Sequence, residues 1–158
     1  GRVARLVYLA ALVLDEGEDP AALMATFPPP PRDGSGAPAA ADRGRSLFVR
    51  QPDGTMAADP TLGPPVFYTT CTDLEAAAAV ARLCPQRAAT FKQSATRANW
   101  RTVPATYIRC LQDRAVPLAA QTQLAARCTN VLDIDTDHSP FLCAPGALAD
   151  LLVPLTRP

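Results

Sequence analysis

Length, composition and charge set the first limits on this protein. The chain has 158 residues, 48% of them hydrophobic, which is enough for one domain with a buried core. Its 15 basic and 15 acidic residues cancel, and this excludes the broad positive field that draws proteins to nucleic acids or anionic membranes. We therefore expect a small neutral ligand or another protein as the partner.

The chain begins with an apolar run, VARLVYLAALV from Val3 to Val13. Periodicity does not separate a buried strand from a buried helix here, but the Val and Tyr content and the polar stop after it favour a strand. No stretch approaches the roughly 20 apolar residues of a membrane span, and the start does not resemble a signal peptide. We expect a cytoplasmic protein without membrane contact. The strand-like start without an initiator Met suggests that the chain was cut from a longer one.

Two contrasting segments follow. Residues 27–44 read FPPPPRDGSGAPAAADRG, where prolines fix the backbone and remove hydrogen-bond donors, so we expect a loop or linker. Leu47–Val49 and Thr55–Met56 then flank the turn sequence Gln51–Gly54. This pattern predicts a short hairpin.

The middle of the chain contains a helix signal. Thr72 followed by Glu75 is a capping-box pattern, and good helix formers continue to Cys84, directly before Pro85. We expect a helix over residues 72–84 that the proline ends.

The last third of the chain alternates between strand and helix patterns. They are a strand at 105–111, a helix at 117–128, a strand at 131–135 and a helix that begins at Pro145. About twenty residues separate the two strands, which is enough for a crossover helix, so we expect them to be parallel. The predicted class is α/β, with helices that cover a parallel sheet.

Two polar residues follow these strands at the edge where parallel sheets bind ligands. Asp113 comes two residues after Leu111, and His138 comes three residues after Asp135, so neighbouring strands would bring both side chains within hydrogen-bonding reach. A carboxylate that holds one imidazole nitrogen leaves the other free to accept a proton from a nucleophile. The alternative is that the lone histidine is a solvated or capping residue, which is the more frequent role of a histidine in a loop.

Three stretches resemble the α/β-hydrolase superfamily. They are LVYLAA from Leu6, PATYIRCLQDRAVP at 104–117 and DIDTDHSPFLCAPGALADLL at 133–152, and they look most like the esterase branch that includes plant methylesterases, hydroxynitrile lyases and bacterial relatives. The resemblance covers about half of the chain. It implies the C-terminal part of an α/β-hydrolase sheet, with Asp113 as the acid of the catalytic triad and His138 as the base.

The same resemblance implies a cap of helices and a small sheet over the site. It divides the chain into a core strand region at 1–20, a cap-like insertion with the Pro-rich linker at 21–98, and a core βαβα region at 99–158. Phe67, Tyr68 and Trp100 are candidates for the apolar wall of the substrate site, with simple packing as the alternative for each. Ser139 is a candidate contact to the histidine loop or a ligand, with helix capping as the alternative.

The family's nucleophile motif, G-x-S-x-G, is not found in this sequence. Ser35 lies in DGSGA, which fails the spacing of that motif, and the other serines and the cysteines lack its glycines. Because the triad order in this fold is Ser, Asp, His, the resemblance places the serine before Gly1.

Metal and disulfide interpretations are not supported by the spacing of the ligand residues. The alternating Asp133, Asp135 and Asp137 begin like a calcium loop, but His138 stands where that loop needs Gly and Ala144 where it needs Glu. The five cysteines are odd in number and have no zinc-type spacing. We expect no metal site and no disulfide framework, with most cysteines buried as small apolar residues.

The sequence thus predicts an esterase-type serine hydrolase that needs no cofactor, present as a C-terminal piece that lacks its nucleophile and is inactive alone. One alternative is a non-catalytic fragment or subunit that binds a partner chain or ligand; another is hydroxynitrile-lyase-like use of the same triad. The predicted partners are a small-molecule ester and either an N-terminal partner chain or a second copy. An unpaired apolar strand at Val3–Val13 would favour such association.

Overall fold

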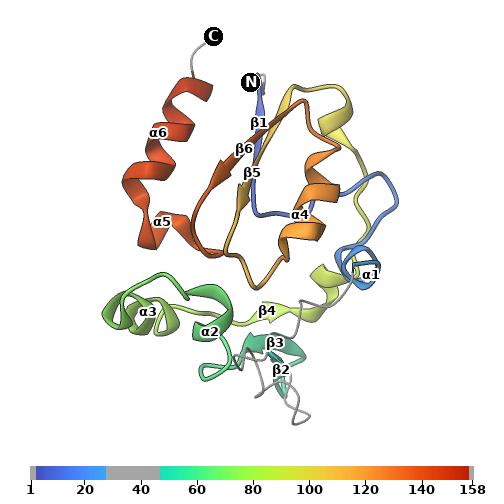
Figure 1. The fold of residues 1–158 in the computed structure, drawn as a ribbon. Helices are drawn as coiled ribbons and strands as arrows, with labels where there is room; N and C mark the ends of the chain where they lie inside the picture. The colour runs from blue at the N-terminus through green and yellow to red at the C-terminus, as the bar shows by residue number, and fades with distance from the viewer. Residues whose placement is uncertain (1–2, 28–46, 157–158) are drawn as a thin grey trace.

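A three-stranded parallel sheet forms the centre of the molecule (Figure 1). The structure is a computed structural model that describes residues 3–27 and 47–156. The strands are β1 (Leu6–Leu9), β5 (Ala105–Cys110) and β6 (Asn130–Ile134), in the order β1-β5-β6. All neighbours are parallel, so the predicted pairing of the last two strands is confirmed.

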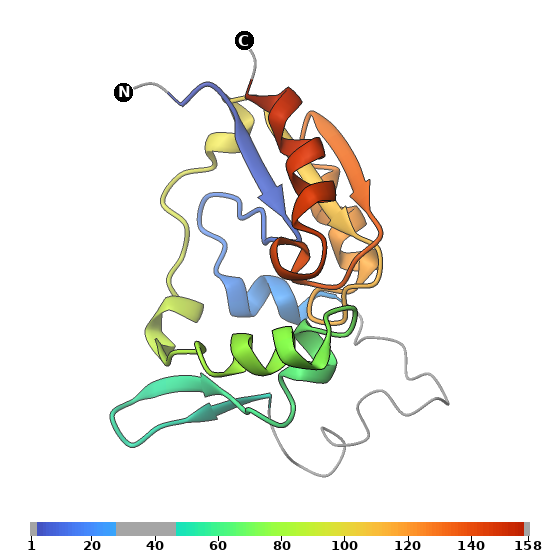
Figure 2. The same cartoon turned by 90° about the vertical axis from the view of Figure 1, so that its left-hand side faces the viewer.

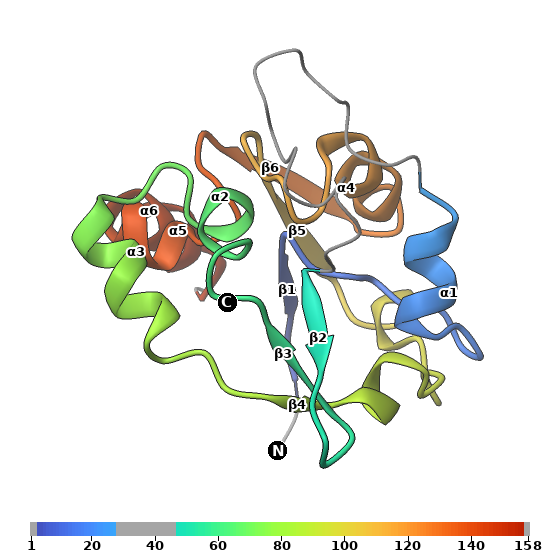
Figure 3. The same cartoon turned by 90° about the horizontal axis from the view of Figure 1, so that it is seen from below.

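Helices cover both faces of this sheet. Helix α4 (Leu118–Ala125) lies on one side, and α5 (Pro140–Cys143) and α6 (Pro145–Leu155) lie on the other, as the view from below shows (Figure 3). Because side chains alternate along a strand, Tyr107 of β5 packs in the cluster of α4, whereas Ile108 and Cys110 pack in the cluster of α6. The helices predicted at 117–128 and from Pro145 are confirmed, and the short α5 was not predicted.

The first strand is shorter than predicted. Only Leu6–Leu9 pair with β5, and Ala10 then adopts a left-handed backbone with φ 43°, which is unusual for a residue with a side chain. The apolar run continues beyond the strand because later residues pack in the core: Val13, for example, is fully buried there and does not pair in the sheet. Within the residues that the structure describes, β1 is an edge strand with β5 as its neighbour.

A second layer lies across the carboxyl ends of these strands (Figure 2). This strand-end layer consists of a second, antiparallel sheet and two helices: β2 (Phe48–Arg50), β3 (Thr55–Ala58), β4 (Gln86–Arg87), α2 (Pro64–Phe67) and α3 (Asp73–Val80). The predicted hairpin is confirmed as β2 and β3, with Gly54 at φ 82° in its turn. The layer and helix α1 (Pro20–Ala25), apart from Pro20, come from the segment predicted as a cap-like insertion, whose limits at 21–98 remain a prediction.

Helix α3 begins as predicted and ends early. The Thr72 hydroxyl accepts a hydrogen bond from the Glu75 amide, and the Glu75 carboxylate accepts one from the Thr72 amide, so the capping box is confirmed. The helix ends at Val80 instead of Cys84. Residues before a proline avoid helical backbone, and no residue of α3 is buried to hold a further turn in place.

Three further expectations concern the loop at 27–44, the cysteines and membrane spans. The loop predicted at 27–44 lies, apart from Phe27, outside the described residues. The expectation that most cysteines are buried is wrong: only Cys110 is, and Cys84 is exposed because it lies beyond the end of α3. Among the described helices, none is long and apolar enough to cross a membrane.

Candidate active site

The structure brings Asp113 and His138 together at the rim of the large sheet. Asp113 follows β5, His138 follows β6, and the His138 Nδ1 lies 2.8 Å from the Asp113 Oδ2. The Asp113 side chain is fully buried, whereas the His138 side chain is 30% exposed. A buried carboxylate thus orients an imidazole that remains accessible from one side.

The turn after β5 holds the Asp113 carboxylate in one orientation. Its Oδ1 accepts hydrogen bonds from the amides of Ala115, at 2.7 Å, and Val116, at 3.0 Å. Its Oδ2 accepts one from the Gln121 Nε2, at 3.3 Å, besides facing the histidine. An aspartate that binds the amides two and three residues further on is a common way to close a turn. The turn therefore positions the carboxylate toward the neighbouring strand end.

Gln121 was not recognised from the sequence as part of this arrangement. It is fully buried in α4, its Oε1 accepts from the Cys110 amide, and its Nε2 also donates to the Cys110 and Val116 carbonyls. It thereby joins the end of β5 to the turn that carries Asp113. The available signal was that Gln121 stands among the apolar residues of one helix face. A buried side-chain amide needs hydrogen-bond partners, which suggests a structural role.

Asp137 fixes the loop of His138 to the strand-end layer. It is fully buried, its Oδ1 accepts from the Ser139 amide at 2.8 Å, and its Oδ2 accepts from the Thr70 amide at 2.7 Å. The sequence shows Asp137 only as one member of an alternating Asp run. Its partner Thr70 is 67 residues away, so only the tertiary structure distinguishes it from Asp133 and Asp135.

His138 lies on the wall of a cavity of about 640 Å³ between the two layers. The wall is mainly apolar, with contributions from α1, the hairpin, α2 and the turn after β5. The residues that give it this character include Met24, Phe48, Met56, Phe67, Phe91 and Val116. Pockets for small molecules are commonly apolar with few polar groups.

The aromatic residues predicted for the substrate wall have different positions. Phe67 lines the cavity, with its ring centroid 5.7 Å from that of His138. Tyr68 packs against Phe67 and is not among the lining residues. Trp100 packs against the core on the α4 side of the sheet, where its indole N–H donates to the Leu14 carbonyl. Ser139 is buried before α5 without a side-chain capping bond, and it too is absent from the cavity wall.

Thiols near the pair do not suit the role of nucleophile. Burial, reinforced by the Asp137 carboxylate, raises the pKa of Cys71 to about 12. Burial also raises the pKa of Cys110 to about 11. Because the thiolate is the reactive form, these raised pKa values lower the fraction of each side chain that can attack a carbonyl.

A parallel sheet with helices on both faces defines an α/β protein, and the aspartate and histidine lie at the ends of adjacent strands, where such folds bind ligands. The sequence matches the model of the alpha/beta hydrolase family over residues 1–151. The chain therefore belongs to this family, which confirms the assignment made from the three motifs.

Known proteins similar to this chain are longer. The alpha/beta hydrolase nvfD of Aspergillus novofumigatus is 29% identical over 160 residues, which cover 99% of this chain and 57% of that protein. This chain thus spans a little over half the length of this curated relative.

Solved structures show the same relation in the fold. Polyneuridine aldehyde esterase has a TM-score of 0.73 at 15% identity, with 98% of this chain and 63% of that one covered. A pyrethroid hydrolase from Sphingobium faniae has 0.67 at 23%, with 98% and 61% covered. A methylesterase from Arabidopsis has 0.66 at 19%, with 97% and 58% covered. The neighbours include the esterase branch that the motifs resembled, and the likeness is one of fold.

Proposed function

We propose that this chain provides the acid and the base of an esterase-type serine hydrolase that cleaves carboxylic esters. Asp113 is the orienting acid and His138 the general base. The observation that carries the proposal is the 2.8 Å contact between the Asp113 Oδ2 and the His138 Nδ1 at the edge of an apolar cavity. Family membership and the esterases among the structural neighbours support it.

In this mechanism, the Asp113 carboxylate accepts a hydrogen bond from Nδ1–H of His138 and leaves Nε2 free to act as a base. Nε2 takes the proton of a serine hydroxyl as its oxygen attacks the ester carbonyl, and then gives that proton to the leaving alcohol. Water then attacks the acyl-enzyme ester: Nε2 takes a proton from the water and gives it to the serine oxygen, which leaves as the free hydroxyl while the carboxylic acid is released. We place the serine and the oxyanion hole in a further part of the fold that precedes β1, as the triad order of this fold requires.

The cavity supports a substrate with a bulky apolar group. Aromatic and Met side chains form most of its wall, and His138 brings the reacting imidazole to the same wall. Binding an apolar group there removes apolar area from water, which makes the free energy of binding more favourable.

A second proposal concerns how the site becomes complete. Val7 of β1 is 40% exposed, and β1 has one strand neighbour among the described residues. We propose that this edge pairs with a preceding segment or a separate chain that carries the serine, and that the 158-residue chain alone does not hydrolyse esters. An unpaired strand edge favours such pairing.

The test uses the longest native polypeptide that contains this chain, with para-nitrophenyl esters as substrates and a fluorophosphonate probe for the serine. His138→Gln and Asp113→Asn are expected to lower kcat/KM by roughly 10⁴-fold. In His138→Gln, labelling by the probe should also be lost. Asp135→Asn, at an exposed position on the same rim, is the matched control and should keep wild-type activity. Wild-type turnover by His138→Gln would refute the proposed role.

A further inference from the structure

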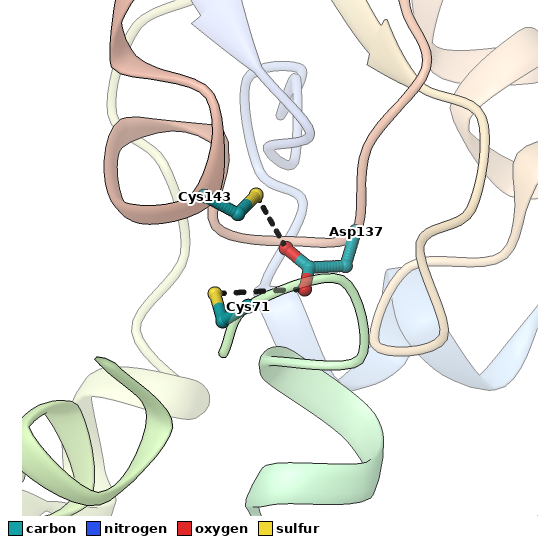
Figure 4. A group of neighbouring side chains, drawn as sticks. All are labelled: Cys71, Asp137 and Cys143. Atoms are coloured by element: carbon teal, nitrogen blue, oxygen red, sulfur yellow. Dashed lines mark hydrogen bonds between the residues drawn. The ribbon is translucent and has the colours of Figure 1, made fainter. Parts of the chain in front are cut away.

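Two cysteines from different layers meet at one buried carboxylate (Figure 4). Cys71 lies between α2 and α3, Cys143 ends α5, and both sulfur atoms point toward Asp137. The Cys71 Sγ is 3.8 Å from the Asp137 Oδ2, and the Cys143 Sγ is 3.5 Å from the Oδ1. The three ligand atoms lie within 4.8 Å of one another. None of this is visible in the sequence, where Cys71 stands 66 residues from Asp137.

These distances suit a tetrahedral metal ion. Zinc binds thiolate sulfur at about 2.3 Å and carboxylate oxygen at about 2.0 Å, so a sulfur and an oxygen ligand at the tetrahedral angle lie about 3.5 Å apart. Each cysteine lies near a different oxygen of Asp137, and the two sulfur–oxygen separations of 3.5 and 3.8 Å are close to this value. Two thiolates favour a soft or borderline ion such as Zn²⁺ or Cd²⁺ over Mg²⁺ or Ca²⁺.

The surroundings hold the ligands in place without an ion. The amides of Thr70 and Ser139 donate to the two oxygens of the Asp137 carboxylate. The Thr70 hydroxyl lies 3.2 Å from the Cys143 Sγ and can donate to a thiolate there. Groups that orient ligands in this way raise the affinity of metal sites. Asp137 is fully buried, whereas both cysteines are partly exposed, which leaves a path for an ion from solvent.

We propose that Cys71, Asp137 and Cys143 form a binding site for Zn²⁺ or a similarly soft divalent cation, with a water as the fourth ligand. Binding replaces two thiol protons, so each ion bound releases two protons, and three anionic ligands leave the loaded site with a charge of −1. The ion would join the strand-end layer to the loop of His138. This site is separate from the Asp113–His138 pair, and its test does not depend on hydrolase activity.

The first experiment titrates the longest native polypeptide that contains this chain, reduced and metal-free, with Cd²⁺ and follows the thiolate-to-cadmium absorption and the protons released. One ion and two protons per chain are expected. Cys71→Ser and Cys143→Ser should each weaken binding by about 100-fold, and Thr70→Val, which removes the hydrogen bond to sulfur, by about tenfold. Cys84→Ser is the control, because Cys84 is exposed and outside the cluster, and it should bind as the wild type does.

A second measurement on the wild type avoids any effect of substitution on folding. With Zn²⁺ in excess, alkylation of Cys71 and Cys143 should be about tenfold slower or more, while alkylation of Cys84 is unchanged; peptide mass mapping separates the three sites. Equal alkylation of Cys71 and Cys143 with and without Zn²⁺ would overturn the proposal. Cadmium binding that survives in both serine variants would overturn it too.

Discussion

The large sheet and the strand-end layer are stabilised in different ways. In the large sheet, five of the six residues of β5 are buried, and apolar clusters lie on both faces. In the strand-end layer, α3 buries none of its residues and all three residues of β2 are exposed. Burial of apolar area supports the first region, whereas α3 and the hairpin of the second depend more on local capping and turn hydrogen bonds.

This difference bears on the candidate site, because the cavity lies between the two regions. The sheet provides His138 and the rigid turn of Asp113, and the strand-end layer provides wall residues such as Phe67. Two hydrogen bonds connect the layer to the sheet: the Thr70 amide donates to the Asp137 carboxylate, and the Asp137 amide donates to the Thr70 hydroxyl. A well-packed sheet thus keeps the proposed acid and base in place, while the shape of the cavity depends on a less buried layer.

The largest expected effect tests the packing of the sheet. Leu124 is 1% exposed in the cluster on the α4 side, and Leu124→Ala should lower the free energy of unfolding by about 2–5 kcal/mol. Leu74 of α3 is 81% exposed, and Leu74→Ala should change it by no more than about 0.5 kcal/mol. Urea unfolding of both variants measures the two values, and similar losses would contradict the contrast drawn between the regions.

The next effect tests the connection between the regions. Asp137→Ala leaves the amides of Thr70 and Ser139, of which the second is buried, without their acceptor, which should cost about 1–3 kcal/mol. Asp135→Ala removes only an exposed contact with Gln112 and should cost no more than about 0.5 kcal/mol.

Urea unfolding compares the two aspartate variants, and amide hydrogen exchange locates the change. In Asp137→Ala, exchange should accelerate around Thr70 while β5 stays protected. A uniform acceleration in both regions would show that Asp137 supports the sheet itself rather than the connection.

The smallest effect tests local stabilisation within the strand-end layer. Thr72→Ala removes the capping hydroxyl of α3 and should cost about 1 kcal/mol. Faster amide exchange should be confined to α3, as followed by NMR. Thr72→Ser keeps the hydroxyl and should behave as the wild type does; a loss as large in this variant would show that the methyl group, not the cap, matters.

Local signals in the sequence predicted much of the fold. The strands at β5 and β6, the helices α4 and α6, the hairpin and the capping box all follow from patterns within a few residues. The ends of β1 and α3 were predicted less well, since an apolar run or a run of helix formers does not show where tertiary contacts stop. Val13 illustrates this: it belongs to the apolar run, yet it packs in the core and lies outside β1.

The sequence alone determined the family and the meeting of Asp113 with His138, whose catalytic roles are a proposal, because each residue follows a strand that a local pattern predicts. Only the tertiary structure decided which other residues join them. Gln121 and Asp137 act through partners on other elements, Phe67 reaches the cavity while Trp100 does not, and Cys71 meets Cys143 across 72 residues of chain. Contacts between segments so far apart depend on how the layers pack, which no local pattern encodes.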